Sequence, residues 1–526
     1  MLHRHLAYYT KHLKNDAPAS LVVFLVALPL CLGIALASGA PLFSGLVTGI
    51  VGGLMVSLLS GSQLSVTGPA AGLTVIVFSA IETLGSFQGL LVAVIIAGFF
   101  QIILGFLQAG IIGAFFPSAV IEGMLAAIGI ILIIKQLPHA TGYDSSFEGD
   151  ESYMQETASS SFFELFEAFE GISLPCVIIS LVSLMILVIW SCLWIKNHIF
   201  LKLIPGPLIT VLWGVSYNGL ALQFAPEWAV SDKHLVNLPP INNVSEFFGN
   251  FISPDFQFLT NPQTYIVAVT IAIIASLETL LSIEAADKLD PFKRITPMNR
   301  ELKAQGIGNI ISGLLGGLPM TAVIVRSSAN INAGAYTRMS CFLHGLWLLV
   351  SVMFLSYYLD TIPLACLSAI LLHTGFKLAN PKLFKRFFKK GMSQFLPFVI
   401  TIIAILATDL LKGMVIGLVV GLFYVIYANY KAAITMTQNG SHYVLSFNKD
   451  VSFLNRALLR KFILSIEENS TVVIDASKTD FVDYDIIETV EDFLKNAIED
   501  NIHVELINFY GSKEFEHHRV QAIIRR

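Results

Sequence analysis

The stretch Gly316-Gly-Leu-Pro-Met-Thr-Ala-Val-Ile-Val-Arg-Ser-Ser-Ala-Asn330 decides the fold, together with an earlier counterpart, Ser60-Gly-Ser-Gln-Leu-Ser-Val-Thr-Gly-Pro-Ala-Ala-Gly72. In each, glycine and proline interrupt apolar sequence, and a short β-like run, 64–67 or 321–325, leads into small residues that can begin a helix. Non-helical backbone is tolerated at membrane depth only where protein or a water-filled cavity surrounds it. Paired interruptions in two halves of a chain are therefore typical of an inverted-repeat membrane transporter whose site lies near the bilayer midplane.

The two half-helices that these stretches predict would face each other with their N-termini. Free N–H groups and the positive end of the helix dipole favour an anion at such a place. Proline at position 69 suits the first helical turn, because its missing N–H removes no hydrogen bond there. The alternative, two ordinary glycine kinks, leaves the pairing and the neighbouring arginine unexplained. The predicted anion-binding residues, which offer backbone N–H groups or hydroxyls, are Thr67, Gly68, Ala70, Ala71, Ser327 and Ser328.

Two charged residues within apolar sequence are the next candidates. An arginine inside a membrane segment is costly and indicates a functional role, so Arg326 is predicted to supply positive charge to the anion, with a structural ion pair as the alternative. Glu278 stands among apolar residues, and a carboxylate balanced between burial and a nearby arginine is suited to carry a proton or hold a cation. Glu278 and Ser282 are therefore the predicted ion-coupling residues. Glu82 and Glu122 fall towards predicted helix ends, where a structural role is favoured.

Composition places the whole chain in a bilayer. Of its 526 residues, 55% are hydrophobic and only 13% charged, and the mean hydropathy is +0.72. Soluble domains carry about 25% charged residues. The net charge of −5 gives no basic stripe for nucleic acid. The five cysteines show no metal-type spacing, and no metal or cofactor is predicted; Na⁺ or H⁺ enters only as a coupling ion.

Apolar runs long enough to cross a bilayer recur along most of the chain. Residues 1–16 are polar and lack a small-residue cleavage site, so the first span is expected to stay attached. The predicted spans are 19–38, 42–59, 67–84, 88–108, 113–134, 173–194, 204–224, 262–283, 301–315, 325–334, 339–358, 363–378, 394–410 and 413–430.

Loop charge predicts the orientation. Cytoplasmic loops collect Lys and Arg, so a cytoplasmic N-terminus requires basic residues in every second loop. The predicted outer segments agree, because 136–172 has no Lys or Arg and 225–261 has only Lys233. The basic residues of the predicted inner segments are Lys196, Lys202, Lys288, Lys293, Arg294, Arg300, Lys382, Lys385, Arg386, Lys389 and Lys390. Both termini are therefore expected in the cytoplasm, in the cell membrane.

The composition changes after the last span. Strand-like runs at 443–447, 471–474 and 503–507 alternate with helical periodicity at 453–467 and 484–500, which predicts a small α/β domain. The Ser- and Glu-rich segment 144–161 is expected to order only locally. The predicted organisation is a cytoplasmic N-terminal segment at 1–18, a transmembrane transport domain at 19–431, a cytoplasmic domain at 432–511 and a tail at 512–526.

At these residues the chain resembles the sulfate permease (SulP) family of anion transporters over nearly its whole length. The resemblance rests on these motifs in order: Ala27-Leu-Pro-Leu-Cys-Leu-Gly-Ile-Ala35, Gly68-Pro-Ala-Ala71, Ser276-Leu-Glu-Thr-Leu-Leu-Ser282, Gly317-Leu-Pro319 and Arg326-Ser-Ser-Ala-Asn-Ile-Asn-Ala-Gly334. It implies a fourteen-span fold of two inverted seven-span repeats divided into core and gate domains, a cytoplasmic STAS domain and a homodimer. It also implies an anion site between the third and tenth spans near Arg326, and cation or proton coupling at Glu278.

The chain departs from the family pattern in two places. Leu30 stands where many members have glutamine, which removes a polar ligand and weakens the case for sulfate; some bicarbonate-type members resemble this chain here. Asp483-Tyr-Asp485 stands where phosphorylated relatives of the STAS domain have serine or threonine. A docking or dimerisation role is therefore favoured over a phosphoserine switch.

The resulting hypothesis is a secondary transporter of small inorganic anions that works by alternating access. A passive anion channel or an anion-dependent membrane motor is the main alternative, since it could use the same pore chemistry. Transport of uncharged nucleobases is disfavoured by Arg326. An enzyme is disfavoured because the chain has no GxSxG, HExxH or P-loop motif and no clustered His or Cys ligands.

Overall fold

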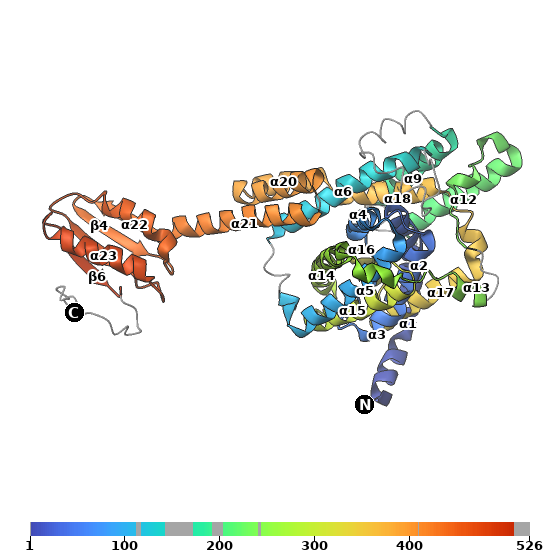
Figure 1. Ribbon diagram of the computed structural model, residues 1–526, viewed down its shortest axis with the longest axis horizontal. Helices are drawn as coiled ribbons and strands as arrows, with labels where there is room; N and C mark the ends of the chain where they lie inside the picture. The colour runs from blue at the N-terminus through green and yellow to red at the C-terminus, as the bar shows by residue number, and fades with distance from the viewer. Residues whose placement is uncertain are drawn as a thin grey trace. The chain divides into compact units, whose positions relative to one another are not determined.

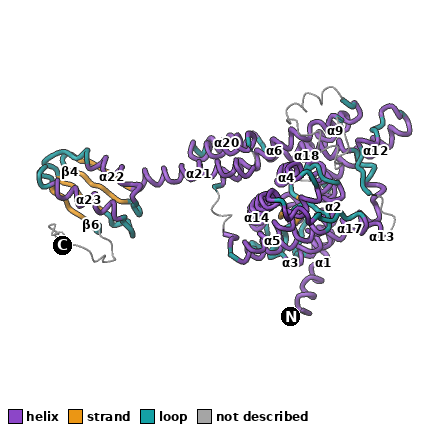
Figure 2. The backbone as a smooth tube through the Cα atoms, in the orientation of Figure 1, coloured by secondary structure: helices purple, strands orange, loops and turns teal. Residues whose placement is uncertain are grey.

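The computed structural model describes residues 2–111, 117–142, 172–191, 204–239, 244–408 and 410–509. Two compact units make up the chain: a larger one of Met1–Lys390 with Phe398–Gly417, and a smaller one of Gly391–Pro397 with Leu418–Arg526. Figure 2 shows that helix dominates the larger unit and that most strand residues belong to the smaller one. The segment 144–161 and the tail 512–526 lie outside the described residues.

The helices of the chain follow the predicted spans. The first half holds α1 (Leu2–Ala37), α2 (Leu42–Val51), the π-helical turn η1 (Gly52–Val56), α3 (Ser57–Leu59), the 3₁₀ turn η2 (Ala71–Leu73), α4 (Thr74–Leu84), α5 (Phe87–Phe106), α6 (Ser118–Thr141), α9 (Leu174–Ser191) and α12 (Gly206–Phe224). The second half holds α13 (Val244–Gly249), α14 (Pro262–Leu289), α15 (Met298–Leu314), α16 (Ile324–Asn332), α17 (Met339–Leu359), α18 (Leu364–Leu378), α19 (Pro381–Lys389), α20 (Met392–Ala407) and α21 (Leu410–Ala433).

Each predicted span is found as a helical segment, although several ends move. The first predicted span, 19–38, belongs to α1, which already begins at Leu2. The span predicted at 113–134 is helix α6 at Ser118–Thr141, because Pro117 forms its N-cap. Among the described residues, seven helices are long and apolar enough to cross a membrane; they include α5, α14 and α17. Large apolar side chains remain exposed on such helices, for example Leu181 at 61% and Phe354 at 74%. Such exposure fits helices that face lipid.

Close backbone crossings reveal the internal repeat. Helix α5 crosses α15 at Gly98 and Gly306, where an added Cβ on either would lie 2.5–2.6 Å from the other residue's carbonyl oxygen. The turn η1 crosses α17 at Gly53 and Gly345 in the same reciprocal way. The first crossing joins the fourth and ninth predicted spans, and the second joins the second and eleventh. Span four corresponds to span eleven, and span two to span nine, in a repeat of seven spans, so the two crossings are equivalent. Figure 1 shows α5 and α15 side by side.

A two-stranded sheet joins the two halves. Strand β1 (Thr67–Pro69) pairs antiparallel with β2 (Met320–Ala322), with Gly68 opposite Thr321. The antiparallel register is the one that an inverted repeat requires. The predicted strand-like runs at 64–67 and 321–325 are therefore displaced by a few residues. Pro69 lies in β1 rather than in a first helical turn, because Ala70 is extended and the helical geometry begins at Ala71.

The smaller unit is an α/β domain, as predicted. Its sheet has the order β3-β4-β5-β6, with β3 antiparallel to β4 and the other neighbours parallel. The elements are β3 (Ile434–Asn439), β4 (His442–Phe447), α22 (Arg456–Ile463), β5 (Thr471–Asp475), α23 (Tyr484–Ala497) and β6 (His503–Ile507). The sequence analysis missed β3, because its residues continue directly from α21 without a turn signal. The side chain of Asp483 caps α23 by accepting from Asp485 N–H.

Candidate functional site

The second half-helix, α16, offers its free N–H groups one turn earlier than the sequence analysis expected. Val323 is its N-cap, and the Val323 N–H donates to Val66 O across the sheet at 2.9 Å. The Ser327 N–H donates to Val323 O at 3.0 Å, so it already closes the first helical turn. The unsatisfied donors of a helix are those of its first turn. The available donors are therefore Ile324, Val325 and Arg326, of which the first two escaped prediction.

The first half-helix has a carboxylate at its N-terminus. Ala70 is extended and accepts from Leu73 N–H, so the helical geometry opens at Ala71. The Gly72 N–H donates to the carboxylate of Glu278, which comes from the middle of α14. A Cβ added at Gly72 would lie 2.6 Å from Glu278 Oε2, so only glycine leaves room for this contact. The Glu278 carboxyl group thus lies at the positive end of the helix dipole.

Arg326 is fully buried and lies against the first half of the chain. Its Nη2 donates to Pro69 O at 3.3 Å, while Nε and Nη1 have no partner among the described residues. The guanidinium also packs on the Cα of Gly68, where any side chain would collide with Nη1. Within the part of the chain that the structure describes, no carboxylate comes within ion-pair distance of it. A buried guanidinium with two unpaired nitrogens is a costly arrangement, since an unpaired buried charge is strongly destabilising.

The predicted hydroxyl ligands are engaged within the protein. Ser327 Oγ accepts from Val66 N–H at 3.0 Å and donates to Val323 O at 2.8 Å. Ser328 Oγ donates to Val325 O at 2.9 Å, and Thr67 Oγ1 accepts from Gln305 Nε2 at 2.9 Å. These bonds fix the ends of the strands and of α16. Of the predicted residues, the structure brings Gly68 against Arg326, and Ser327 against Val66, the neighbour of Thr67. The hydroxyls of Ser327 and Ser328 position α16.

A polar stripe on α15 supports both strands and was missed in the sequence. Buried Glu301 accepts from Ser60 Oγ at 2.6 Å and from Gln305 Nε2 at 3.1 Å. The side-chain amide of Asn309 bonds twice to the backbone of Met320 in β2. Met320 N–H donates to Asn309 Oδ1 at 2.7 Å, and Asn309 Nδ2 donates to Met320 O at 3.3 Å. The signal was present as Glu301, Gln305 and Asn309 at successive i,i+4 positions, which share one helix face.

The remaining predicted acidic and coupling residues take ordinary positions. Ser282 lies buried one helical turn beyond Glu278 on α14. Glu82 is exposed near the end of α4, and Glu122 forms an ion pair with Arg386 at 2.8 Å. Both observations agree with the structural role expected for these two carboxylates.

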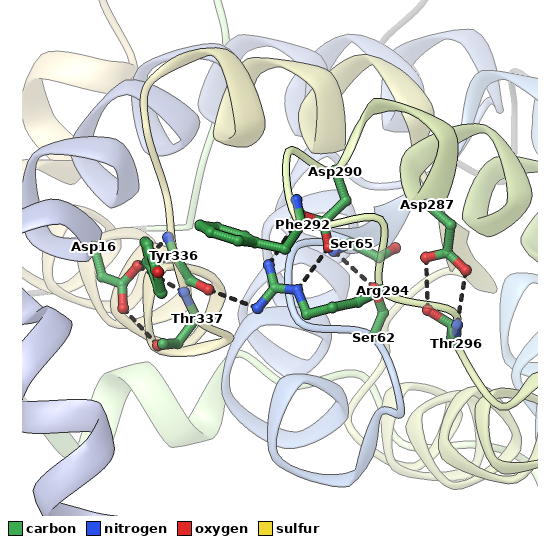
Figure 3. Close-up of polar contacts among 10 residues, drawn as sticks. All are labelled: Asp16, Ser62, Ser65, Asp287, Asp290, Phe292, Arg294, Thr296, Tyr336 and Thr337. Carbon is green, nitrogen blue, oxygen red and sulfur yellow. Dashed lines mark hydrogen bonds and ion pairs between the residues drawn. The ribbon is translucent and has the colours of Figure 1, made fainter.

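A polar cluster fastens one end of α16 to its neighbours (Figure 3). Buried Asp16 of α1 accepts from Tyr336 N–H at 2.7 Å, from Thr337 N–H at 2.9 Å and from the Thr337 hydroxyl. Arg294 donates to Asp290 at 2.6 Å and to Tyr336 O at 2.9 Å. Burial raises the pKa of Asp290, but the hydrogen bonds from Arg294 and Phe292 outweigh it and hold the pKa below its usual value. The cluster joins α1, the α14–α15 loop and the segment after α16.

Asp16→Ala is expected to lower the stability of the protein by about 2–4 kcal/mol, because it leaves two buried N–H groups and one hydroxyl without an acceptor. Thermal unfolding of the detergent-solubilised protein measures the loss as a lower Tm. Asp232→Ala, at an exposed position, is the matched control and should leave Tm unchanged. An Asp16→Ala protein with the wild-type Tm would show that the cluster does not stabilise the fold.

If Arg326 binds the anion, as the sequence predicts, Gly68→Ala should reduce anion transport by about tenfold to a hundredfold, since displacement of a positioned group by about 1 Å can have such effects. The added methyl would collide with Arg326 Nη1 and push the guanidinium away from β1. Initial uptake rates in proteoliposomes measure the change. Gly219→Ala is the control, because its Cβ would meet nothing within 4 Å. Equal rates for wild type and Gly68→Ala would place Arg326 outside the transport path.

Comparison with known proteins identifies the family and the fold. Residues 13–403 match the model of the family described as the sulfate permease family. The YvdB protein of Bacillus subtilis (strain 168) is 26% identical over 453 residues, which cover 85% of this chain and 80% of YvdB. Two solved structures share the fold. The transmembrane domain of a cyanobacterial bicarbonate transporter, BicA, has a TM-score of 0.61 at 22% identity and covers 78% of this chain and 97% of that one. The structure of SLC26A9 has a TM-score of 0.75 at 16% identity and covers 95% of this chain and 85% of that one.

Proposed function

This chain belongs to the sulfate permease family, and we propose that it is a secondary active transporter of small inorganic anions of the sulfate or bicarbonate class. The observation that carries the proposal is the fully buried Arg326, whose Nε and Nη1 have no partner beside the open N-terminus of α16. A charge of this kind is stabilised when an anion binds. A neutral solute would not stabilise the unpaired charge of Arg326 in this way.

The anion is held between the two half-helix starts. The N–H groups of Ile324 and Val325 and the free nitrogens of Arg326 donate to its oxygens, and the dipole of α16 adds to the attraction. All these donors belong to helix α16, so little loss of conformational entropy is expected when the anion binds. The core that carries this site then moves against the gate domain, which exposes the anion to one side of the membrane at a time.

Glu278 couples the anion to a cation. Its carboxylate occupies the N-terminus of the first half-helix, and its Oε2 has no partner. The negative charge competes with an anion for the same positive helix end. Protonation of Glu278, or Na⁺ bound between Glu278 and Ser282, removes that competition. Anion and cation therefore bind together, which is the thermodynamic basis of symport.

The substrate class, the location and the assembly complete the proposal. Leu30, buried in α1 directly after Pro29, offers no polar ligand and favours bicarbonate over sulfate. The names of the relatives allow both substrates, because YvdB is named as a putative sulfate transporter and BicA as a bicarbonate transporter. The bias of Lys and Arg among the loops places both termini in the cytoplasm and the transport unit in the cell membrane. The working unit is a homodimer.

Uptake into proteoliposomes tests the proposal. Labelled bicarbonate and sulfate are offered with and without inward H⁺ or Na⁺ gradients. Saturable uptake that one gradient drives above equilibrium supports a coupled transporter and identifies both substrate and driving ion. Flux that does not saturate and ignores every gradient would instead favour a passive anion channel or an anion-dependent membrane motor.

A further inference from the structure

Helix α19 (Pro381–Lys389) has two faces of opposite character. At 100° per residue, its four cationic side chains and that of the C-cap Lys390 cover one side, and its apolar side chains cover the other. Phe387 is fully buried and stacks on Phe398 of α20 at 4.7 Å, while Phe384 meets the same ring edge-on at 5.0 Å. The cations, all exposed, are Lys382, Lys385, Arg386, Lys389 and Lys390.

The positive face is not neutralised within the protein. Arg386 forms an ion pair with Glu122 at 2.8 Å, and Lys390 lies over the Phe387 ring at 5.0 Å. In the described parts of the chain, Lys382, Lys385 and Lys389 have no carboxylate within 4.0 Å. They lie at i, i+3 and i+7, so the three ammonium groups share one stripe of the helix. A solvated charged face is the simpler interpretation, and a second feature argues against it.

That feature is an exposed aromatic ring at the edge of the positive stripe. Phe388 is 64% exposed, and Phe376 near the end of α18 is 56% exposed. The chain enters α19 from the apolar helix α18 and leaves it for the apolar helix α20, with only Lys390 and Gly391 between. Because α19 is a charged helix between two apolar ones, we expect it to lie at a bilayer surface. Cations beside exposed aromatic rings are typical of helices that lie in the lipid headgroup layer.

We propose that α19 is a binding site for anionic phospholipid headgroups. Lys382, Lys385 and Lys389 contact the lipid phosphates, and Phe388 enters the upper acyl region beside them. Arg386 stays with Glu122 and fixes the helix to α6. An acidic soluble protein would satisfy the lysines but would give no reason for an exposed Phe388 at this level of the membrane.

Native mass spectrometry of the full-length protein in detergent tests the site, with phosphatidylglycerol and phosphatidylcholine as probes. Wild type should retain phosphatidylglycerol preferentially. The triple variant Lys382→Gln, Lys385→Gln, Lys389→Gln should bind it roughly a hundredfold more weakly, since each cation near an anionic surface contributes about fivefold. Phosphatidylcholine retention should stay the same. Phe388→Ser should weaken phosphatidylglycerol binding while leaving the lysines in place.

The matched control loses the same three positive charges, but in the smaller unit, and should bind phosphatidylglycerol as wild type does. Its substitutions are Lys461→Gln, Lys478→Gln and Lys495→Gln. Proteoliposome uptake by each variant verifies that it is folded. Equal phosphatidylglycerol retention by wild type and the α19 triple variant would overturn the proposal. So would displacement of the lipid by inorganic phosphate at the same concentration, because the site would then recognise the free anion. Binding of soluble polyglutamate in preference to phosphatidylglycerol would assign the face to an acidic protein instead.

Discussion

Arg326→Ala is expected to reduce anion uptake by roughly a hundredfold or more, since two charge-assisted hydrogen bonds of about 1.5–3 kcal/mol each are lost. The guanidinium is fully buried, and Nε and Nη1 remain unpaired inside the protein. Alanine removes both the charge and the donors and leaves the helix start to bind the anion alone. Initial uptake rates in proteoliposomes, measured over a range of anion concentrations, give the loss in kcat/KM.

Two further variants make this result specific. Arg326→Lys keeps the charge but has a compact ammonium group in place of the planar fork, so an intermediate loss is expected. Arg300→Ala is the matched control, because Arg300 is exposed and its Nε donates only to Leu59 O at 3.0 Å. Arg326→Ala protein that binds and transports anions with wild-type constants would contradict the proposed position of the anion.

Glu278→Gln is expected to abolish the response to cation gradients while saturable anion binding persists. Glutamine retains an oxygen that accepts from Gly72 N–H, so the start of the first half-helix keeps its contact. It has no titratable proton and no negative charge, so it can neither carry H⁺ nor attract Na⁺. The accumulated anion should then fall to the level measured without any gradient. Because the competing charge is gone, anion affinity should rise or stay the same.

Glu284→Gln is the control for this variant. Glu284 lies on the same helix, is exposed and pairs only with Lys288 at 2.6 Å. Its replacement should leave gradient-driven uptake unchanged, as expected for an exposed ion pair. If Glu278→Gln still accumulates anion in response to a gradient, Glu278 is not the coupling residue, although Arg326 can remain the anion ligand. The Arg326 and Glu278 variants thus test binding and coupling separately.

The sequence determined the membrane architecture because its signals are local. Long apolar runs predict spans wherever they occur, and glycine and proline mark where a span must break. The two broken helices, Arg326 at the start of the second and Glu278 within α14 can therefore all be recognised from the sequence. The small α/β domain followed from its change in periodicity, apart from strand β3, which continues from α21 without a turn.

Tertiary structure alone decided how these pieces meet, because the contacts join residues far apart in the chain. The sequence could not show that Glu278 reaches Gly72, or that Arg326 lies on Gly68 and bonds Pro69 rather than a carboxylate. The free N–H groups shifted by one turn because pairing with β1 makes Val323 the N-cap of α16. Composition and periodicity record what each segment buries, whereas register, close glycine crossings and unpaired buried charge depend on which segments pack together.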